Sequence, residues 1–330
     1  MAKKILIRMP NWLGDAVMAT PAVDTIIKES PGASLYLLGS KGVCEMFKHD
    51  TRFTEVMVDI TKKSKLRLSG IRELAEVINK KYAPFDEIFV LTNSFGSTLL
   101  CRFIDAKRRI GASAGMRNLL LNDVIKIDKT AHQAVKYNQI VNGYFKSEHE
   151  TGKTSILLSE TVTYPRKTIG IAPGAAYGGA KRWEAHKFAE VALKLSSDYD
   201  IVILGSPNEE MIAKKIEEVL RFNGVGNYQN LVGKTSLYML LSHIAGLELF
   251  ICNDSGPMHI AGALGVPTVA IFGPTNHTQT YQWGNEKYTL IRDDIECAPC
   301  MKRECPLGHH NCMKNISAQQ VLDAAKALLA

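Results

Sequence analysis

Short apolar runs alternate along the chain with longer stretches whose apolar residues recur at helical spacing. The apolar runs predict buried strands at residues 3–9, 34–38, 56–60, 87–92, 168–171 and 200–205. Between them, stretches such as residues 16–28, 131–145, 184–195 and 206–222 predict helices. Strands and helices that alternate in this way indicate an α/β fold with parallel sheets.

The stretch from residue 249 to residue 277 contains a βαβ pattern with a polar loop at its first turn. A predicted strand at 247–252 leads into Asn253-Asp254-Ser255-Gly256, and Pro257 suits the first residue of the short helix that follows. In a parallel sheet this turn lies at the carboxyl ends of the strands, where the free N–H groups of a helix favour an anion. The loop is therefore predicted to bind a group such as a diphosphate.

A second loop, made of small residues, precedes the predicted helix at 184–195. It spans residues 172–180 and is followed by Lys181-Arg182-Trp183. Small residues let the backbone approach a ligand closely, and a lysine supplies a mobile point charge. The combination suits a diphosphate clamp, whereas a single lysine in a loop would be a weak signal.

Polar residues also follow two predicted strands in the first half. Gly14-Asp15 lies at the turn from the first strand into a helix, and Asn93-Ser94 ends the strand at 87–92. Both turns are expected at the carboxyl edge of a sheet, where ligands bind. From the residues alone, Asp15 is either a helix cap or a functional carboxylate.

The chain length of 330 residues exceeds what one ordinary core accommodates and indicates two domains of about 150 residues each. We expect them at residues 1–160 and 161–330. Thr235 is expected to cap a helix over residues 236–245, and Ser317 with Gln320 forms a capping box for the last helix.

A net charge of +7 favours acidic partners, which include nucleic acid, an anionic membrane surface and a phosphorylated substrate, and it also serves solubility. Residues 62–81 combine an apolar helical face with many lysines and arginines, typical of a surface helix or of a membrane-surface contact. Arg102, Lys107, Arg108, Arg109 and Arg117 add charge that suits a phosphorylated acceptor. The sequence has no apolar segment of spanning length and no signal-peptide pattern, so a cytoplasmic location is expected.

The seven cysteines fit a reducing compartment. Four of them, Cys297, Cys300, Cys305 and Cys312, form a compact C-x2-C-x4-C-x6-C pattern with two histidines between. Thiolates at this spacing suit zinc, and the alternatives are buried thiols or a disulfide pair.

Several of these motifs together resemble glycosyltransferase family 9, the heptosyltransferases. The shared features, in order, are Gly14-Asp15, Lys181-Arg182-Trp183, Asp254-Ser255-Gly256 with His259, the Phe-Gly-Pro-Thr run at 272–275, and the cysteine tail. The resemblance covers nearly the whole chain. It implies the GT-B fold, in which two Rossmann-like domains with parallel sheets face a central cleft, the first holding the acceptor and the second the ADP-heptose donor. In such two-domain glycosyltransferases the C-terminal helix is expected to return to the first domain.

The resemblance also implies an activity and roles for single residues. The activity is inverting transfer of heptose from ADP-heptose to the first heptose of the lipopolysaccharide inner core, with Asp15 as general base and Lys181 on the donor phosphates. Donor contacts are expected from Thr235, Glu209 (or its neighbour Glu210), Asp254, Ser255, Gly256, Met258 and His259, and acceptor contacts from Gly14, Asn93 and Ser94. The chemistry needs no cofactor, although a structural zinc is compatible with the tail.

The implied partners are ADP-heptose, a phosphorylated lipid A-Kdo-heptose acceptor and the anionic cytoplasmic face of the inner membrane, with no nucleic acid. Fold alone does not separate this activity from another sugar transferase or a nucleotide-sugar epimerase. A zinc-stabilised protein that binds an anionic ligand is the alternative from another class.

Overall fold

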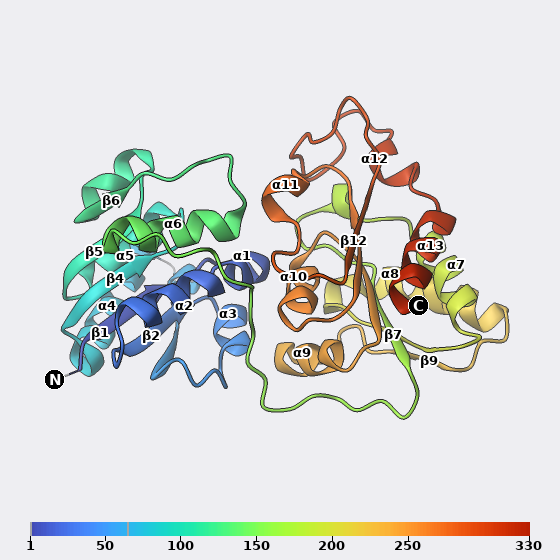
Figure 1. The fold of residues 1–330 in the computed structure, drawn as a ribbon, viewed down its shortest axis with the longest axis horizontal. Helices are drawn as coiled ribbons and strands as arrows, with labels where there is room; N and C mark the ends of the chain where they lie inside the picture. Colours follow the sequence, from blue (N-terminus) through green and yellow to red (C-terminus); the bar gives the residue numbers. More distant parts are fainter. Residues whose placement is uncertain (1, 65) are drawn as a thin grey trace. The chain divides into compact units, whose positions relative to one another are not determined.

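All strand pairings within two separate six-stranded sheets are parallel (Figure 1). The computed structural model describes residues 2–64 and 66–330 and divides into two compact units, one ending at Leu157 and one spanning Leu158–Ala330. The strand orders are β3-β2-β1-β4-β5-β6 and β12-β11-β10-β7-β8-β9. In each sheet the second and third strands lie on one side of the first strand, and the next three lie on its other side. The parallel sheets agree with the alternating pattern, and each unit has the doubly wound Rossmann-like arrangement that the family resemblance implied.

The first unit contains the sheet of β1 to β6 and the helices between its strands. Its strands are β1 (Lys4–Arg8), β2 (Ser34–Gly39), β3 (Glu55–Val58), β4 (Phe85–Val90), β5 (Ala106–Ala112) and β6 (Asp123–Ile125). Its helices are α1 (Leu13–Met18), α2 (Thr20–Glu29), α3 (Lys41–Met46), η1 (Thr61–Lys63), α4 (Arg67–Tyr82), α5 (Phe95–Phe103), η2 (Gly115–Leu120) and α6 (Gln133–Phe145). The predicted helix at 16–28 is thus two helices, because Pro21 lies in the first turn of α2 and helix α1 ends just before it.

The second unit repeats the arrangement with β7 to β12. Its strands are β7 (Thr168–Ala172), β8 (Asp200–Ile203), β9 (Tyr228–Asn230), β10 (Leu249–Asn253), β11 (Thr268–Phe272) and β12 (Tyr288–Arg292). Its helices are η3 (Gly179–Lys181), α7 (Ala185–Leu195), η4 (Pro207–Glu209), α8 (Glu210–Phe222), α9 (Leu237–Ala245), α10 (Gly256–Ala263), α11 (His277–Thr280), α12 (Asn311–Lys314) and α13 (Ala318–Leu329).

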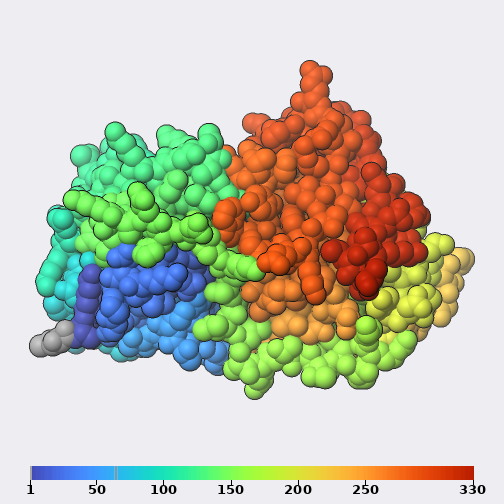
Figure 2. Space-filling model, viewed as in Figure 1, coloured from blue at the N-terminus to red at the C-terminus, as the bar shows by residue number. Residues whose placement is uncertain are grey.

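Helix α13 belongs to the second unit. The predicted capping box is present, with the Ser317 side chain accepting from the Gln320 backbone and the Gln320 side chain accepting from Ser317 N. The apolar face of α13 joins the core formed by α7, α8 and the sheet, so the helix packs on β10 to β12 instead of returning to the first domain. Its outer face forms part of the surface of the second unit (dark red, Figure 2).

Only part of the apolar stripe predicted at 62–81 is buried. Ile71, Ala75 and Ile78 of α4 pack into the core on one face of the first sheet. Leu66, Leu68 and Val77 stay exposed. Residue 65 lies outside the described residues. The stripe is therefore split between a packing face and an exposed apolar surface.

Candidate active site

Asn253, the last residue of β10, ties three segments together at the carboxyl edge of the second sheet. Its Oδ1 accepts a hydrogen bond from Trp183 N at 3.0 Å, and its Nδ2 donates to Pro173 O at 2.8 Å. Asn253 is fully buried, so these bonds satisfy its amide in the absence of water. They fix the small-residue loop after β7 beside the loop that begins at Asp254.

Asp254 and Lys181, which the sequence singled out separately, form an ion pair. Lys181 Nζ lies 2.6 Å from Asp254 Oδ2, with side-chain exposures of 13% and 4%. Thr275 Oγ1 also donates to Asp254 Oδ2, and this threonine ends the Phe-Gly-Pro-Thr run after β11. The Lys181 ammonium lies 4.9 Å from the centre of the Tyr177 ring. A positive charge is thus held in a nearly buried position by one carboxylate and one aromatic face.

The start of α10 has the features of an anion site. Ser255 is the N-cap residue, and Pro257 lies in the first turn. The Ser255 Oγ is buried and has no hydrogen-bond partner within residues 2–64 and 66–330. Helix N-termini favour anions through their free N–H groups and dipole. An oxygen atom of a bound anion would supply the acceptor that the buried Ser255 hydroxyl lacks.

The two other residues predicted on α10, His259 and Met258, are buried. The Met258 side chain is fully enclosed, and its carbonyl accepts from the Gln282 amide. Met258 therefore supports the helix from within the domain, and its thioether is not available at the surface for a ligand.

The structure distinguishes the two glutamates considered for the donor ribose. Glu209 is buried at the carboxyl ends of β7 and β8, where its carboxylate lies against Gly174 and Gly205, whereas Glu210 is exposed. Glu209 Oε2 accepts from Ser206 N at 2.6 Å and completes a capping box. A β-carbon on Gly174 would lie 1.8 Å from Glu209 Oε1, so glycine is needed here for the carboxylate to fit.

The predicted cap of α9 was displaced by one residue. Ser236, not Thr235, is the N-cap, because the Ser236 side chain accepts from Met239 N at 3.2 Å and the helix begins at Leu237. A serine and a threonine in sequence both suit a cap, and the register of the apolar face decides between them. Thr235 lies half-buried just before this cap.

In the first unit, Asp15 lies in the first turn of α1, where Trp12 is the N-cap. Asp15 is therefore not the capping residue that the alternative interpretation required. The negative charge of Asp15 also acts on Tyr137, a residue of α6. Burial, and secondly the negative charge of Asp15, raise the pKa of Tyr137 above its usual value. Gly14 precedes Asp15 in the same turn and is buried.

Arg8, at the end of β1, was missed by the sequence interpretation. Its fully buried guanidinium lies 2.7 Å from Asp59 Oδ2 and donates to Asn11 Oδ1 at 3.0 Å, to Ser97 Oγ at 3.0 Å and to Met9 O at 2.7 Å. These bonds join the loop that leads to Asp15 with α5. An arginine inside an otherwise apolar strand was the available signal, because buried charges require such partners.

Asn93 and Ser94 lie between β4 and α5, next to β1 in the sheet order. Asn93 is exposed, and Ser94 is the N-cap of α5, accepting from Ser97 N at 3.4 Å. Arg117 stabilises this turn, since its guanidinium donates hydrogen bonds to Thr92 O and Ala112 O. These two polar residues therefore share the carboxyl edge of the first sheet with Gly14 and Asp15.

Four of the five basic residues predicted to face a phosphorylated acceptor have partners within the protein. Arg109 donates to the carbonyls of Cys101, Ile104 and Ala106, and Arg117 is bound as described. Lys107 pairs with Asp86 at 2.7 Å, and Arg108 with Asp123 at 3.2 Å. Arg109 and Arg117 are buried and donate mainly to carbonyl groups, and Arg117 Nε has no hydrogen-bond partner among the described residues. The acceptor role of these two arginines stays a prediction.

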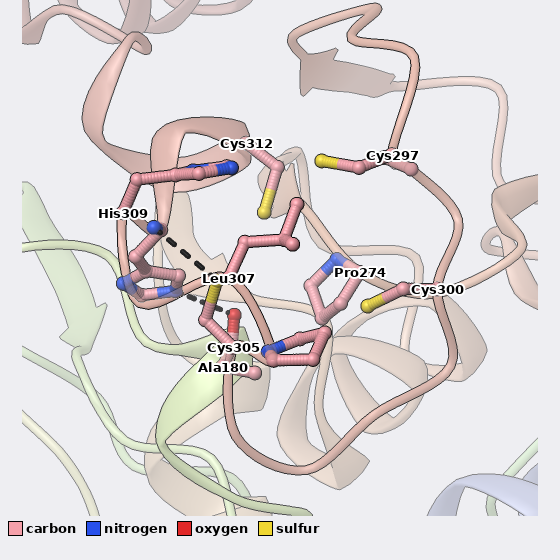
Figure 3. Close-up of a pocket in the computed structure, with 11 residues that line it drawn as sticks. Ala180, Pro274, Cys297, Cys300, Cys305, Leu307, His309 and Cys312 are labelled. Atoms are coloured by element: carbon pink, nitrogen blue, oxygen red, sulfur yellow. Dashed lines mark hydrogen bonds between the residues drawn. The ribbon is translucent and has the colours of Figure 1, made fainter.

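The four tail cysteines line one cavity (Figure 3). All four are free thiols. Hydrogen bonds from the backbone N–H of His310, and then of Leu307, Gly308 and His309, lower the pKa of Cys305, while burial and the neighbouring thiols raise the pKa of Cys312 to about 11. Among the residues that the structure describes, no three histidine, cysteine or acidic side chains stand close enough together to hold a metal ion.

Comparison with known proteins shows that this chain is similar to heptosyltransferases over nearly its full length. The structure described as "Structure of E. coli ADP-heptose lps heptosyltransferase II" has a TM-score of 0.84 and 28% identity, over 99% of this chain and 98% of that one. Lipooligosaccharide heptosyltransferase 2 of Campylobacter jejuni is 35% identical over 99% of this chain and 98% of its own length. Lipopolysaccharide heptosyltransferase 2 of Escherichia coli K12 is 29% identical over 99% and 98%.

Two Rossmann-like units that match such a structure over their full length define a glycosyltransferase with the GT-B fold. The model of "Glycosyltransferase family 9 (heptosyltransferase)" matches residues 72–311. The chain belongs to this family, and it is a glycosyltransferase.

Proposed function

We propose that the protein transfers heptose from ADP-heptose to the first heptose of the lipopolysaccharide inner core, as a heptosyltransferase II. The observation that carries the proposal is the nearly buried Lys181–Asp254 pair beside the start of α10. The similar structure described as an ADP-heptose lps heptosyltransferase II supports ADP-heptose as the donor. Relatives of similar length that are named lipooligosaccharide or lipopolysaccharide heptosyltransferase 2 support the acceptor class. The reaction belongs to lipopolysaccharide synthesis, which suits a cytoplasmic enzyme.

The donor diphosphate binds across the carboxyl edge of the second sheet in this proposal. Lys181 supplies a positive charge, and the N-terminus of α10 with the partnerless Ser255 Oγ supplies hydrogen bonds. Glu209 accepts from the ribose hydroxyls, with the adenine near Thr235. Gly256 allows the phosphate to approach the backbone, while His259 supports the helix or reaches the sugar.

The chemical step is a single displacement with inversion. The acceptor hydroxyl oxygen bonds to the anomeric carbon of heptose as the bond from that carbon to the β-phosphate oxygen breaks. The hydroxyl proton passes to the Asp15 carboxylate, and the electron pair leaves with ADP. Negative charge grows on the leaving oxygen, which the lysine and the helix dipole stabilise, so the chemistry needs no cofactor.

The acceptor lies against the first unit, with Gly14, Asn93 and Ser94 beside the base. It is a lipid A-Kdo-heptose molecule that carries phosphate. Among the described residues, Arg102 makes no ion pair. Its positive charge is therefore available to the phosphate of the acceptor.

The lipid part of such an acceptor requires a contact with the anionic membrane surface. Among the described residues, no helix has the length and apolar character to cross a membrane. We assign the contact to Leu66, Leu68 and Phe95, which are 73%, 49% and 51% exposed. Arg67 reaches over the start of α5 at Gly96, so positive charge lies beside these apolar side chains, as membrane-surface sites require.

Vesicle sedimentation tests this contact. Wild type is expected to bind vesicles rich in phosphatidylglycerol and to leave phosphatidylcholine vesicles unbound. Leu68→Glu should abolish the binding, whereas Met211→Glu, at an exposed apolar position of α8 in the second unit, should retain it. Equal binding by both variants would remove the assignment.

The function itself is tested with two acceptors, one carrying the first heptose and one ending in Kdo. With ADP-heptose, only the heptose-bearing acceptor should gain the mass of one heptose, with release of one ADP for each transfer. Transfer to the Kdo acceptor would indicate another transferase of the family. Conversion of ADP-heptose without any acceptor would indicate an epimerase.

A further inference from the structure

The segment between β12 and α12, together with α12 itself, brings four thiols around one cavity. The proposed chemistry does not use these thiols. Cys297, Cys300 and Cys305 are half-buried in a stretch without strand or α-helix, and Cys312 is buried in α12. Their sulfur atoms point toward the same space (Figure 3). Free thiols of this number and spacing, C-x2-C-x4-C-x6-C, suit the binding of a soft metal ion.

The backbone around Cys305 is arranged to stabilise a thiolate. His310 N donates to Cys305 Sγ at 3.3 Å. The chain returns on the sulfur through a left-handed Gly308 and a left-handed His310, with φ of 73° and 59°. A strained left-handed conformation at a residue other than glycine is kept where the surrounding structure requires it. Here it directs an N–H group at the sulfur.

We propose that Cys297, Cys300, Cys305 and Cys312 bind one zinc ion. Four thiols bind as thiolates and release up to four protons to solvent, with Zn–S distances of about 2.3 Å. In the described residues the side chains do not yet converge to such distances, so the ion would draw the thiols of the loop inward. His310 is excluded as a ligand through Nε2, which donates to Ala180 O at 2.8 Å.

The site would brace the loop that carries Lys181. Besides the His310–Ala180 bond, Ala180 N donates to Arg303 O at 3.0 Å, and Tyr177 Oη donates to Met301 O at 2.8 Å. Ala180 itself lines the cavity. The residues bonded to the loop after β7 thus lie between the proposed zinc ligands, so fixing those ligands fixes the loop. This part of the inference rests on the proposed donor site, whereas zinc binding does not.

Zinc binding is tested on the full chain without reference to activity. Protein equilibrated with equimolar Zn²⁺ under a thiol reductant and then desalted should retain about one equivalent by elemental analysis. Replacement by Co²⁺ should give the visible bands of a tetrahedral ion and thiolate charge-transfer absorption. Cys300→Ser should lose both signals. Cys44→Ser should keep them, because the serine hydroxyl can keep the bond that the Cys44 thiol donates to Met57 O.

Less than about a tenth of an equivalent in wild type, or an unchanged cobalt spectrum in Cys300→Ser, would overturn the site. If Cys300→Ser fails to fold, cobalt titration of wild type still decides, since octahedral bands without charge transfer exclude thiolate ligands.

The brace is tested by ADP titration of the zinc-loaded and chelated protein. Chelation should weaken ADP binding about tenfold, and ADP should tighten zinc binding by the same factor, because the coupling is reciprocal. Zinc bound with no effect on a measurable ADP affinity would overturn the brace alone. Absence of ADP binding in both forms would instead count against the proposed donor site.

Discussion

At the scale of single residues, the Lys181–Asp254 pair is predicted to combine a structural and a binding role. Removal of one partner from a nearly buried pair leaves an uncompensated charge, which typically costs about 3–5 kcal/mol. Removal of both charges avoids that penalty. Stability and ligand affinity are therefore expected to respond differently to the same substitutions.

Lys181→Ala should lower the free energy of unfolding and weaken ADP binding. The double variant Lys181→Ala/Asp254→Asn should regain most of the stability, since the unpaired carboxylate is gone, but not the ADP affinity, since the ammonium is still absent. Urea unfolding and calorimetric ADP titration on the same preparations measure both. Recovery of ADP affinity in the double variant would show that the lysine acts only through the carboxylate.

Ser255→Ala separates a ligand contact from a structural one. The Oγ has no partner in the described part of the protein and makes no cap hydrogen bond, so its removal should leave the melting temperature unchanged or slightly raised. A hydrogen bond to a charged phosphate is worth about 1.5–3 kcal/mol, so ADP affinity should fall roughly 10- to 100-fold. A lower melting temperature with unchanged ADP affinity would contradict the proposed contact.

Residue types at predicted turns were informative wherever the turn followed a clear strand. Asp254 and Lys181 were singled out in loops that follow predicted strands, and the structure brings them together. Glu209 was named, with Glu210 as the alternative, only through the family resemblance. Arg8 was missed because its partners Asp59 and Ser97 lie 51 and 89 residues away in sequence. No local pattern contains such a pairing, since the sheet order creates it.

At the scale of elements, the start of α9 shows how one residue of register matters. Ser236→Ala should destabilise the protein by about 1 kcal/mol through loss of the cap bond, whereas Thr235→Ala should cost less. Chemical denaturation of the two variants gives the comparison. A larger loss in Thr235→Ala would return the cap to the position that the sequence suggested.

The turn after β7 depends on Gly174. Gly174→Ala should displace the Glu209 carboxylate and break its capping box, with a loss of about 1–2 kcal/mol in stability and weaker ADP binding. Gly226→Ala in the same unit is the control, because a β-carbon there meets no atom within 4 Å. If ADP binding by Gly174→Ala equals that of the control, Glu209 is not a donor contact.

Elements with a plain apolar pattern were predicted well, and the missed ones explain the limits. Strand β5, which pairs with β4, begins with Ala-Lys-Arg-Arg. These charged residues interrupt the apolar pattern by which a strand is recognised. Strands β6 and β9 have three residues each, too few for a period to appear. The stripe of α4 was visible, but the sequence did not show that Leu66 and Leu68 remain outside the core.

At the scale of the whole molecule, the alternation of strands and helices predicted parallel sheets and the chain length predicted two domains. The family resemblance implied that both domains are Rossmann-like, and both sheets have that form. The expected boundary after residue 160 compares with one after Leu157. The last helix was misassigned because a capping box defines where a helix begins and not where its apolar face packs.

In the proposed reaction, the base lies on the first unit and the ADP site on the second. The most direct test measures single-turnover heptose transfer at saturating acceptor together with ADP affinity, for Asp15→Asn and Lys181→Ala. Asp15→Asn should slow transfer by roughly 10²- to 10⁴-fold and leave ADP affinity near wild type, because the amide cannot accept a proton. Lys181→Ala should lose ADP affinity as well as transfer. Near-normal transfer by Asp15→Asn, or unchanged ADP affinity in Lys181→Ala, would contradict this division of roles.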